Sequence, residues 1–292
     1  MEKIIECDHI THYYGSRLIY KDLSFDVEKG KILGLLGKNG TGKTTIINIL
    51  NGYLKPRSGV CRLFGESMES ISPATKARVG LLLEQHVQHA YFTVSQIEKF
   101  YSAFFPRWNR DAYYELLKKL QVIPSQKLNT MSCGQRSQVA LGLLFAQDPE
   151  LLILDDFSMG LDPGYRRLFV EYLKEYTTAE NKTVFLTSHI IQDMEMLIDD
   201  CMIMDYGRLL LHRPVQEIMD NFKRYRFTSD QALDLSDDKD FWNASSLGNK
   251  WEVYSFLPSD DVKAKLSNYG IRQIESDRLS LEDAFIGLTG KY

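Results

Sequence analysis

A glycine-rich segment beginning at Gly37 has the residue types and the spacing that can hold phosphate groups. It reads Gly37-Lys38-Asn39-Gly40-Thr41-Gly42-Lys43-Thr44, which follows the pattern G-x-x-x-x-G-K-[ST]. Glycines allow backbone N–H groups to curl around phosphate oxygens without a Cβ in the way. Lys43 has the length to reach the β- and γ-phosphates, and the Thr44 hydroxyl can bind Mg²⁺. The segment therefore predicts a phosphate loop for a nucleoside triphosphate.

Two neighbouring carboxylates follow an apolar run further along the chain. Residues 151–154 predict a buried strand, and Asp155 and Asp156 come directly after it. Asp155 is suited to hold Mg²⁺, usually through water, and Asp156 to orient or deprotonate an attacking water. An acid pair after a buried strand is also a common start of a loop. The phosphate loop upstream favours the catalytic interpretation.

Polar side chains also follow two other predicted strands. His189 comes after the apolar residues 184–186, at the edge where α/β sheets place their ligands, and we interpret it as a candidate sensor of the γ-phosphate. Gln85 comes after residues 79–83 and could reach Mg²⁺ or the attacking water. Taken alone, a histidine is more typical of a surface position or of a core position with satisfied hydrogen bonds, and Gln85 is typical of an ordinary surface position.

The hydrophobic pattern predicts the elements that must position these side chains. Residues 3–35 predict short strands separated by turns, and the last of them, 32–36, leads into the phosphate loop. Residues 43–50 predict the helix that follows the loop, whose positive end would point at the phosphates. Residues 94–120 have helical periods, and Pro106 divides them into two helices.

The pattern changes after about residue 222. Residues 223–227 and 251–256 are strand-like and flank a polar stretch. A helix is predicted from Ser280, where Ser280 and Asp283 have the spacing of a capping box. We interpret residues 222–292 as a small appended α+β domain, separate from residues 1–221.

Composition limits the classes of protein that this chain can belong to. It has 292 residues, is 44% hydrophobic and carries a formal net charge of −4, which argues against a nucleic-acid partner. The cysteines, Cys7, Cys61, Cys133 and Cys201, are scattered, which argues against a disulfide framework or a zinc site. The amino terminus lacks the pattern of a signal peptide, and no apolar run approaches the roughly 18 residues of a membrane helix. We therefore expect no membrane span in the chain itself.

A short motif before the acid-tipped strand makes the prediction specific. Met131-Ser132-Cys133-Gly134-Gln135 is similar to the LSGGQ signature, and at this point the sequence resembles the nucleotide-binding subunits of ABC transporters. The other family motifs match in order: Tyr14 as the adenine-stacking aromatic, Gln85 as the Q-loop glutamine, Asp162 in the D-loop Gly160-Leu161-Asp162-Pro163, and His189 as the switch histidine.

The resemblance implies a fold and a site. The fold is α/β, an ABC-type P-loop ATPase core with an antiparallel β subdomain and a helical subdomain at about residues 87–145. ATP with Mg²⁺ would be the ligand. The residues implied to bind the nucleotide are Tyr14, Gly37, Asn39, Gly40, Thr41, Gly42, Lys43, Thr44 and Thr45. Asp156, His189 and Gln85 are implied to be catalytic, and Thr44, Gln85 and Asp155 to bind the metal.

The resemblance also implies partners. Two ATP-binding subunits, identical or related, pack head to tail, so that Ser132, Gly134 and Gln135 of one contact ATP held by the other. Closure around ATP and reopening after hydrolysis drive transmembrane permease subunits. These place the protein at the cytoplasmic face of the plasma membrane. The aromatic and histidine-rich residues 86–92 are the expected docking surface for the permease, with a solvated loop as the alternative.

The last predicted helix narrows the class. Ser280-Leu281-Glu282-Asp283-Ala284-Phe285, followed by Leu288-Thr289-Gly290, looks like the ending of ABC-2 type bacterial exporter ATPases. That resemblance implies export of drugs, antibiotics or peptides, and a peptide-toxin exporter is the most specific expectation. The alternatives are an importer ATPase, a soluble ABC ATPase acting on the ribosome or DNA, and a nucleotide-binding regulatory subunit with little hydrolysis.

Two positions depart from the family pattern. Asp156 stands where the family has a glutamate, which moves the carboxylate roughly 1.5 Å away from the water. Cys133 replaces the first signature glycine and puts a side chain where the backbone must approach the γ-phosphate. Because a misplacement of about 1 Å can cost around a hundredfold in rate, we expect intact ATP binding with slow hydrolysis.

Overall fold

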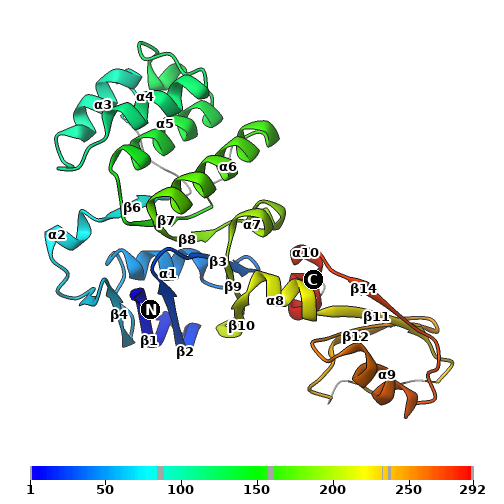
Figure 1. Ribbon diagram of the computed structural model, residues 1–292. Helices are drawn as coiled ribbons and strands as arrows, with labels where there is room; N and C mark the ends of the chain where they lie inside the picture. Colours follow the sequence, from blue (N-terminus) through cyan, green and yellow to red (C-terminus); the bar gives the residue numbers. More distant parts are fainter. Residues whose placement is uncertain (1, 84–88, 157–160, 232, 236–237, 291–292) are drawn as a thin grey trace.

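A six-stranded sheet forms the centre of the molecule (Figure 1). The computed structural model describes residues 2–83, 89–156, 161–231, 233–235 and 238–290. In sheet order, the strands found there are β10 (Arg208–Pro214), β9 (Asp200–Asp205), β3 (Ile32–Gly37), β8 (Thr183–Thr187), β7 (Leu151–Leu154) and β6 (Val79–Leu82). All neighbours pair in parallel except β9 and β10, which form a hairpin. Strands buried on both faces read as continuous apolar runs, which explains why β7 was recognisable in the sequence.

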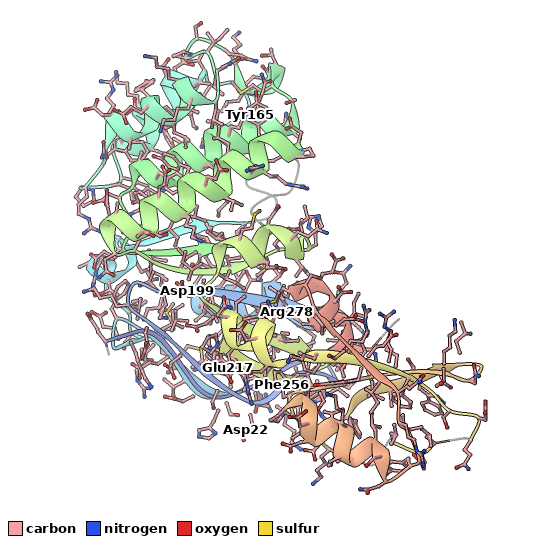
Figure 2. All side chains as sticks on the ribbon, turned by 45° about the vertical axis from the view of Figure 1, so that its right-hand side comes forward. Asp22, Tyr165, Asp199, Glu217, Phe256 and Arg278 are labelled. Atoms are coloured by element: carbon pink, nitrogen blue, oxygen red, sulfur yellow. The ribbon has the colours of Figure 1, made fainter. Side chains whose placement is uncertain are left out.

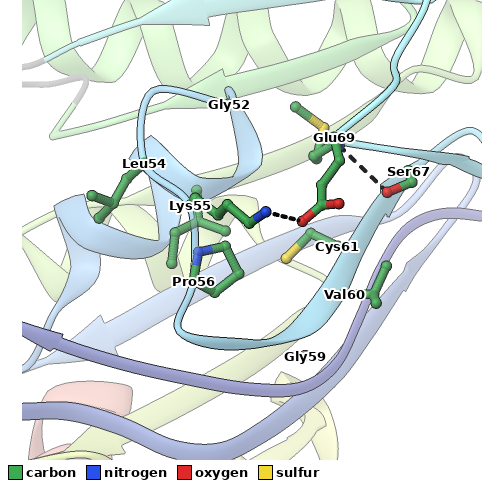
Figure 3. A pocket seen from close by; sticks show the side chains of 11 residues that line it. Gly52, Leu54, Lys55, Pro56, Gly59, Val60, Cys61, Ser67 and Glu69 are labelled. Carbon is green, nitrogen blue, oxygen red and sulfur yellow. Dashed lines mark hydrogen bonds and ion pairs between the residues drawn. The ribbon is translucent and has the colours of Figure 1, made fainter.

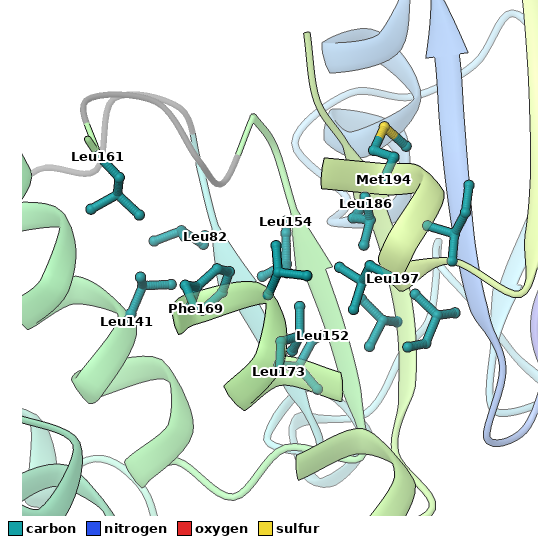
Figure 4. Packing of buried hydrophobic residues seen from close by; sticks show 14 of the residues in the cluster. Leu82, Leu141, Leu152, Leu154, Leu161, Phe169, Leu173, Leu186, Met194 and Leu197 are labelled. Atoms are coloured by element: carbon teal, nitrogen blue, oxygen red, sulfur yellow. The ribbon is translucent and has the colours of Figure 1, made fainter. Parts of the chain in front are cut away.

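Side chains along β3 alternate between the two faces of the central sheet and so pack into two separate hydrophobic cores. Leu33 and Leu35 face α1 (Lys43–Leu50) and the antiparallel sheet beyond it. Ile32 and Leu36 face the opposite layer, which contains α6 (Pro163–Glu180) and α7 (Ile191–Leu197). Figure 4 shows this second layer, where leucines of β7 and β8 pack against Phe169, Leu173 and Leu197 of the two helices. The carboxyl end of β3 is thereby fixed from both sides.

The antiparallel sheet corrects one prediction. Residues 3–35 contain long strands, not short ones: β1 (Lys3–Tyr14) and β2 (Arg17–Glu28) are each 12 residues long and form a hairpin. The pairing register shifts near His9, whose φ of 52° is left-handed, and Asp22 on the other strand has a φ of 59°. Such bulges break the alternation of side chains, so a continuous strand looks like several short ones. The sheet is completed by β4 (Ser58–Leu63) and β5 (Glu66–Ser67).

A helical subdomain lies on the side of the central sheet opposite the antiparallel sheet (Figure 1). It contains α3 (Val94–Ser102), α4 (Arg110–Lys119) and α5 (Cys133–Ala146), with α2 (Pro73–Lys76) in the approach to β6. The break at Pro106 lies between α3 and α4, as the sequence predicts. Thr93, Asn109 and Ser132 cap the three helices with their side chains. The position of α5, which carries the signature residues, is therefore set by a defined start.

The carboxyl-terminal segment combines a sheet with helices, in agreement with the α+β prediction. The sheet order is β12 (Trp242–Leu247), β13 (Lys250–Ser255), β11 (Lys223–Thr228) and β14 (Ile274–Arg278). Helix α9 (Ser259–Ser267) covers one face through Val262 and Leu266. The segment meets the rest of the chain near α8 (Val215–Asn221), where the guanidinium of Arg213 lies 4.8 Å from the centroid of the Phe256 ring. Figure 2 labels Glu217 and Phe256 at this junction.

The last helix, α10 (Leu281–Thr289), packs between the carboxyl-terminal sheet and the rest of the chain. Its buried residues Leu281, Phe285 and Leu288 belong to the core cluster shared with α7 and α8. In Figure 1 it lies beside α7 and α8, away from α9. Among the described residues no helix is long and apolar enough to cross a bilayer.

Candidate nucleotide site

A cavity of about 480 Å³ opens where β3, β7 and β8 end. It is lined by Tyr14, Arg17, Ile19, Asn39, Gly40, Gly42, Lys43, Thr44, Thr45, Asp155, Asp156, Thr187, Ser188 and His189. These residues come from the hairpin of β1 and β2, the loop before α1, and the segments that follow β7 and β8. The cavity thus lies at the carboxyl edge of a parallel sheet, the usual place for a ligand in this architecture.

The loop before α1 has a backbone that requires glycine. Gly40 and Gly42 have φ values of 80° and 107°, and a Cβ on Gly42 would lie 2.6 Å from the Tyr20 hydroxyl oxygen. Tyr20 is buried and its hydroxyl donates a hydrogen bond to the Gly42 carbonyl oxygen. Burial raises the pKa of Tyr20, so this hydroxyl stays a donor at neutral pH. Arg17 makes a similar contact, because its guanidinium donates to the Gly40 carbonyl oxygen at 3.0 Å.

Polar side chains within the loop hold its shape. Lys43 Nζ donates to the carbonyl oxygens of Gly37 at 2.7 Å and Lys38 at 3.3 Å. Thr41 is buried, and its hydroxyl donates to the Lys38 carbonyl at 2.8 Å. Gly37 and Thr41 therefore shape the loop from behind and do not line the cavity. Lys43, in contrast, lines the cavity.

The carboxylates and the histidine meet at the opposite wall. Thr187 joins them, since its hydroxyl donates to Asp155 Oδ1 at 2.7 Å and accepts from the Asp156 backbone N–H at 3.0 Å. His189 Nδ1 lies 2.7 and 2.8 Å from the two carboxylate oxygens of Asp156. Asp156 has a left-handed backbone with a φ of 48°, a conformation that aspartate tolerates better than most residues. The two predicted catalytic side chains are thus in direct contact.

An ion pair lies behind His189. Asp193 follows it on α7, is buried, and lies 3.3 Å from the Arg166 guanidinium of α6. Burial raises the pKa of Asp193, and the charges of Arg166 and His189 act in the opposite direction. The pair connects α6, which follows Asp162, with α7, which follows His189.

Three of the residues that line the cavity fit a magnesium ion. Asp155, Asp156 and Thr44 all present oxygen atoms, the donors that this hard cation prefers. Asp155 is only 3% exposed and its Oδ1 is fixed by Thr187. Among the described residues no cluster of three or more His, Cys, Asp or Glu forms a metal centre by itself. The arrangement therefore suits a metal shared between the protein and a phosphate ligand.

The other predicted residues lie elsewhere. Ser132 and Gln135 form a reciprocal capping box at the start of α5, and Gly134 lies between them. Asp162 caps α6, accepting from the N–H groups of Gly164 and Tyr165. None of these residues lines the cavity of this chain. Gln85 lies outside the described residues.

Sequence reasoning missed four residues that line the cavity. Arg17, Ile19, Thr187 and Ser188 were not predicted as site residues, although all of them line it. Arg17 carried a detectable signal, since a cation follows Tyr14 in the turn between two strands. Thr187 was visible only as the end of a strand, because its role depends on β7 and β8 being neighbours.

A second cavity, of about 450 Å³, lies between the end of α1 and β4 (Figure 3). Its lining is mixed, with Ile49, Leu54 and Val60 beside the ion pair of Lys55 and Glu69, whose atoms are 2.9 Å apart. It shares no lining residue with the first cavity. We assign it no function.

Comparison with known proteins identifies the class. A family model described as ABC transporter matches residues 20–158. The chain is 32% identical over 310 residues to the bacitracin transport ATP-binding protein of Bacillus licheniformis, covering 99% of this chain and 98% of that protein. It is 27% identical over 303 residues to the Nod factor export ATP-binding protein I of Cupriavidus metallidurans, covering 100% and 99%.

Solved structures share the fold. An ATP-binding subunit of an ABC transporter superposes with a TM-score of 0.67 at 22% identity, covering 74% of this chain and 92% of that one. A dimeric ATP-binding cassette in a post-hydrolysis state bound to ADP and Pi gives a TM-score of 0.65 at 18% identity, covering 72% and 98%.

The chain belongs to the ABC transporter family. It is an ATP-binding subunit of the P-loop ATPase type, and therefore an ATP hydrolase by class. Its relatives include subunits named for bacitracin transport and Nod factor export, in agreement with the predicted ABC-2 type exporter class.

Proposed function

We propose that this protein is the ATP-hydrolysing motor subunit of an ABC exporter that moves drugs or peptides across the membrane. The observation that carries the proposal is the cavity that brings the phosphate loop, Asp155, Asp156 and His189 together. The match to the bacitracin transport protein supports the exporter class, because it extends over 99% of this chain. The cargo class follows from that relative alone.

Each residue has a separate task in the proposed site. Tyr14 is exposed at the cavity edge and stacks on adenine, while the loop N–H groups and Lys43 bind phosphate oxygens. Thr44 and Asp155, with Gln85, hold Mg²⁺, which supplies charge neutralisation at the phosphates. Asp156 accepts a hydrogen bond from the attacking water, and His189 orients that carboxylate and senses the γ-phosphate.

A second ATP-binding subunit, identical or related, completes the site in this proposal. Ser132 stands at the N-terminus of α5 and is exposed, as is Cys133 beside it. The first turn of α5 presents backbone N–H groups that suit a phosphate of the partner's ATP. Ser132, Gly134 and Gln135 would bind there, and Asp162 would lie at the interface.

Permease subunits dock, in this proposal, on aromatic residues next to the Q-loop. Of the predicted docking residues 86–92, those from 89 onward are described. His89 lies 5.2 Å from Phe92 and 5.0 Å from Phe100 between ring centroids, and Phe104 extends the group. Tyr91 is 84% exposed. Exposed aromatic groups of this kind favour a protein partner. The protein is then peripheral, held by the permease at the cytoplasmic face of the plasma membrane.

Deletion of the gene in its host tests this proposal. We expect the deletion strain to become more sensitive to a peptide antibiotic such as bacitracin, or to lose export of its own peptides. The wild-type gene should restore resistance or export. A gene encoding Lys43→Ala, expressed at the same level, should not. Unchanged sensitivity and unchanged peptide export would contradict the exporter assignment. Cofractionation with ribosomes or DNA would favour the soluble alternative.

A regulatory subunit with little hydrolysis is the second candidate. Two observations favour it, the exposed Cys133 in the signature and the Asp156 carboxylate held by His189. Phosphate release from the purified assembly separates the two functions. A motor releases phosphate continuously, whereas a regulatory subunit binds ATP and releases almost none.

A further inference from the structure

The last helix of the chain extends from the switch helix to the phosphate loop. Helix α10 packs against α7 and α8 through Leu281, Ala284 and Phe285, all of which are buried. One end is held by a side chain of the phosphate loop, and the other by side chains of the helix that follows His189. The contact therefore involves more than apolar packing.

The carboxyl end of α10 is held by the phosphate loop. Lys38, the residue after Gly37, donates from Nζ to the Thr289 carbonyl oxygen at 2.8 Å. Lys38 is only 9% exposed, although it lies in a surface loop. The last carbonyl groups of a helix have no partner within the helix and carry partial negative charge, so an ammonium group is a favourable cap.

The amino end of α10 is held by the switch helix. Glu195 of α7 accepts a hydrogen bond from the Leu281 backbone N–H at 2.8 Å. Gln192, one turn earlier on α7, donates to Glu282 at 2.9 Å. Because α7 starts at Ile191, directly after His189 and Ile190, both contacts lie within two turns of the switch histidine.

We propose that α10 holds the phosphate loop in its ATP-binding conformation, and that Lys38 is the positioning residue through which it does so. Three side-chain hydrogen bonds connect the loop to its surroundings: two are accepted by loop carbonyl groups, and one is donated by Lys38 of the loop. Tyr20 and Arg17 hold the loop from the β1–β2 hairpin, and Lys38 ties it to α10. The inference rests on the proposed function, since the conformation matters only if the loop binds ATP.

The consequence follows from conformational entropy. A loop that is already ordered loses little freedom when its N–H groups converge on phosphate, whereas a loosened loop must be ordered by the ligand. Loss of the Lys38 contact should therefore weaken ATP binding. By linkage, ATP should in turn strengthen the docking of α10.

ATP binding by the purified full chain, measured by titration calorimetry with Mg²⁺, tests the proposal. We expect Lys38→Met to weaken ATP binding about three- to tenfold, the effect of one hydrogen bond. Lys38→Arg, which keeps a cationic donor, should bind like the wild type. Glu195→Ala loosens the other end of α10 and should also weaken binding. The double variant should be no weaker than the weaker-binding single variant, because both act through one helix.

Lys174→Ala is the matched control. Lys174 Nζ donates to the Met196 carbonyl of α7 at 2.8 Å, the same kind of bond at the same distance, but it does not contact α10 or the loop. The Lys174→Ala variant should bind ATP with the affinity of the wild type. In steady state, Lys38→Met should raise the KM for ATP and leave kcat unchanged at saturation. A merely structural role would lower the amount of folded protein and leave KM unaltered.

Two results would overturn the proposal. One is wild-type affinity for ATP in Lys38→Met, and the other is a double variant whose loss equals the product of the single losses. A wild-type chain that binds no ATP would instead contradict the proposed function.

Discussion

At the residue scale, one carboxylate limits what the site can do. Asp156 reaches into the cavity from a left-handed backbone position, and both of its oxygens contact His189 Nδ1. A carboxylate held in this way must accept hydrogen bonds from both the histidine and a water molecule. Its side chain is also one methylene shorter than the glutamate of the family pattern. Both facts lead to the expectation of slow hydrolysis with intact ATP binding.

The first prediction concerns Gly42. In Gly42→Ala the new methyl group meets the Tyr20 hydroxyl at 2.6 Å and a φ of 107° is unfavourable for alanine. We expect ATP binding at least about tenfold weaker and a free energy of unfolding about 1–3 kcal/mol lower. Calorimetric titration and urea unfolding measure these. The control is Gly65→Ala, where φ is 79° but nothing lies within 4 Å of the added atom. It should lose stability and keep its ATP affinity, and an equal loss of affinity would count against the loop geometry.

The second prediction concerns Arg17. Its guanidinium lines the cavity and contacts the Gly40 carbonyl, so it adds positive charge where phosphates enter. We expect Arg17→Ala to weaken ATP binding about three- to tenfold, with a smaller difference at high salt. Lys21→Ala removes the same charge from an exposed position on β2, outside the cavity, and should bind normally. Equal effects of the two substitutions would mean that Arg17 acts only through net charge.

At the element scale, a cluster of partly buried ion pairs connects the helical subdomain to the central sheet. Glu150 precedes β7 and accepts from Arg78, before β6, at 3.0 and 2.8 Å, and from Arg107, before α4, at 2.9 Å. The hydrogen bonds from Arg78 and Arg107 lower the pKa of Glu150 to about 2. This carboxylate therefore joins three elements that are distant in sequence.

The third prediction gives this cluster a pH dependence. A lowered pKa in the folded state stabilises the fold above the unfolded value of 4.5, and the contribution is lost as pH falls toward about 2. Since Glu150 is one-third exposed, we expect Glu150→Gln to cost about 1–2 kcal/mol at pH 7 and less at pH 3.5. Urea unfolding at both pH values measures this. Glu171→Gln, which removes an exposed pair with Arg167, should change little at either pH. A Glu150→Gln difference that is the same at both pH values would be inconsistent with the lowered pKa.

How much the sequence could predict depended on whether a signal was local. The strand 151–154 and the helix 43–50 were predicted with the bounds that the structure has, because a contiguous apolar run marks the strand and Gly42 and Gly52 flank the helix. The bulged strand β1 was not, since its register shifts break the alternation on which such predictions depend. Arg17 and Thr187 were missed for a different reason. Their places in the site are set by strand order, which the local pattern does not contain.

At the scale of the whole molecule, the segment 222–292 contributes residues to two hydrophobic cores. Its sheet and α9 form their own core, whereas α10 returns to the main core and reaches the phosphate loop. The sequence predicts the segment as one appended domain, and that division of the chain stays a prediction. The return of α10 depends on packing between Phe285 and a surface far away in sequence, which no local pattern reveals.

Steady-state phosphate release from Mg²⁺ATP tests the central claim, that this cavity is an ATP site whose turnover is limited by Asp156 and Cys133. Wild type, Asp156→Glu and Cys133→Gly are compared, with Lys43→Ala as the inactive reference. We expect wild type to release phosphate continuously but slowly, at a rate clearly above that of the reference, and Asp156→Glu to raise kcat by about ten- to a hundredfold. Cys133→Gly should raise kcat as well, with ATP affinity unchanged in both variants. If neither substitution raises kcat, the account of the site is wrong.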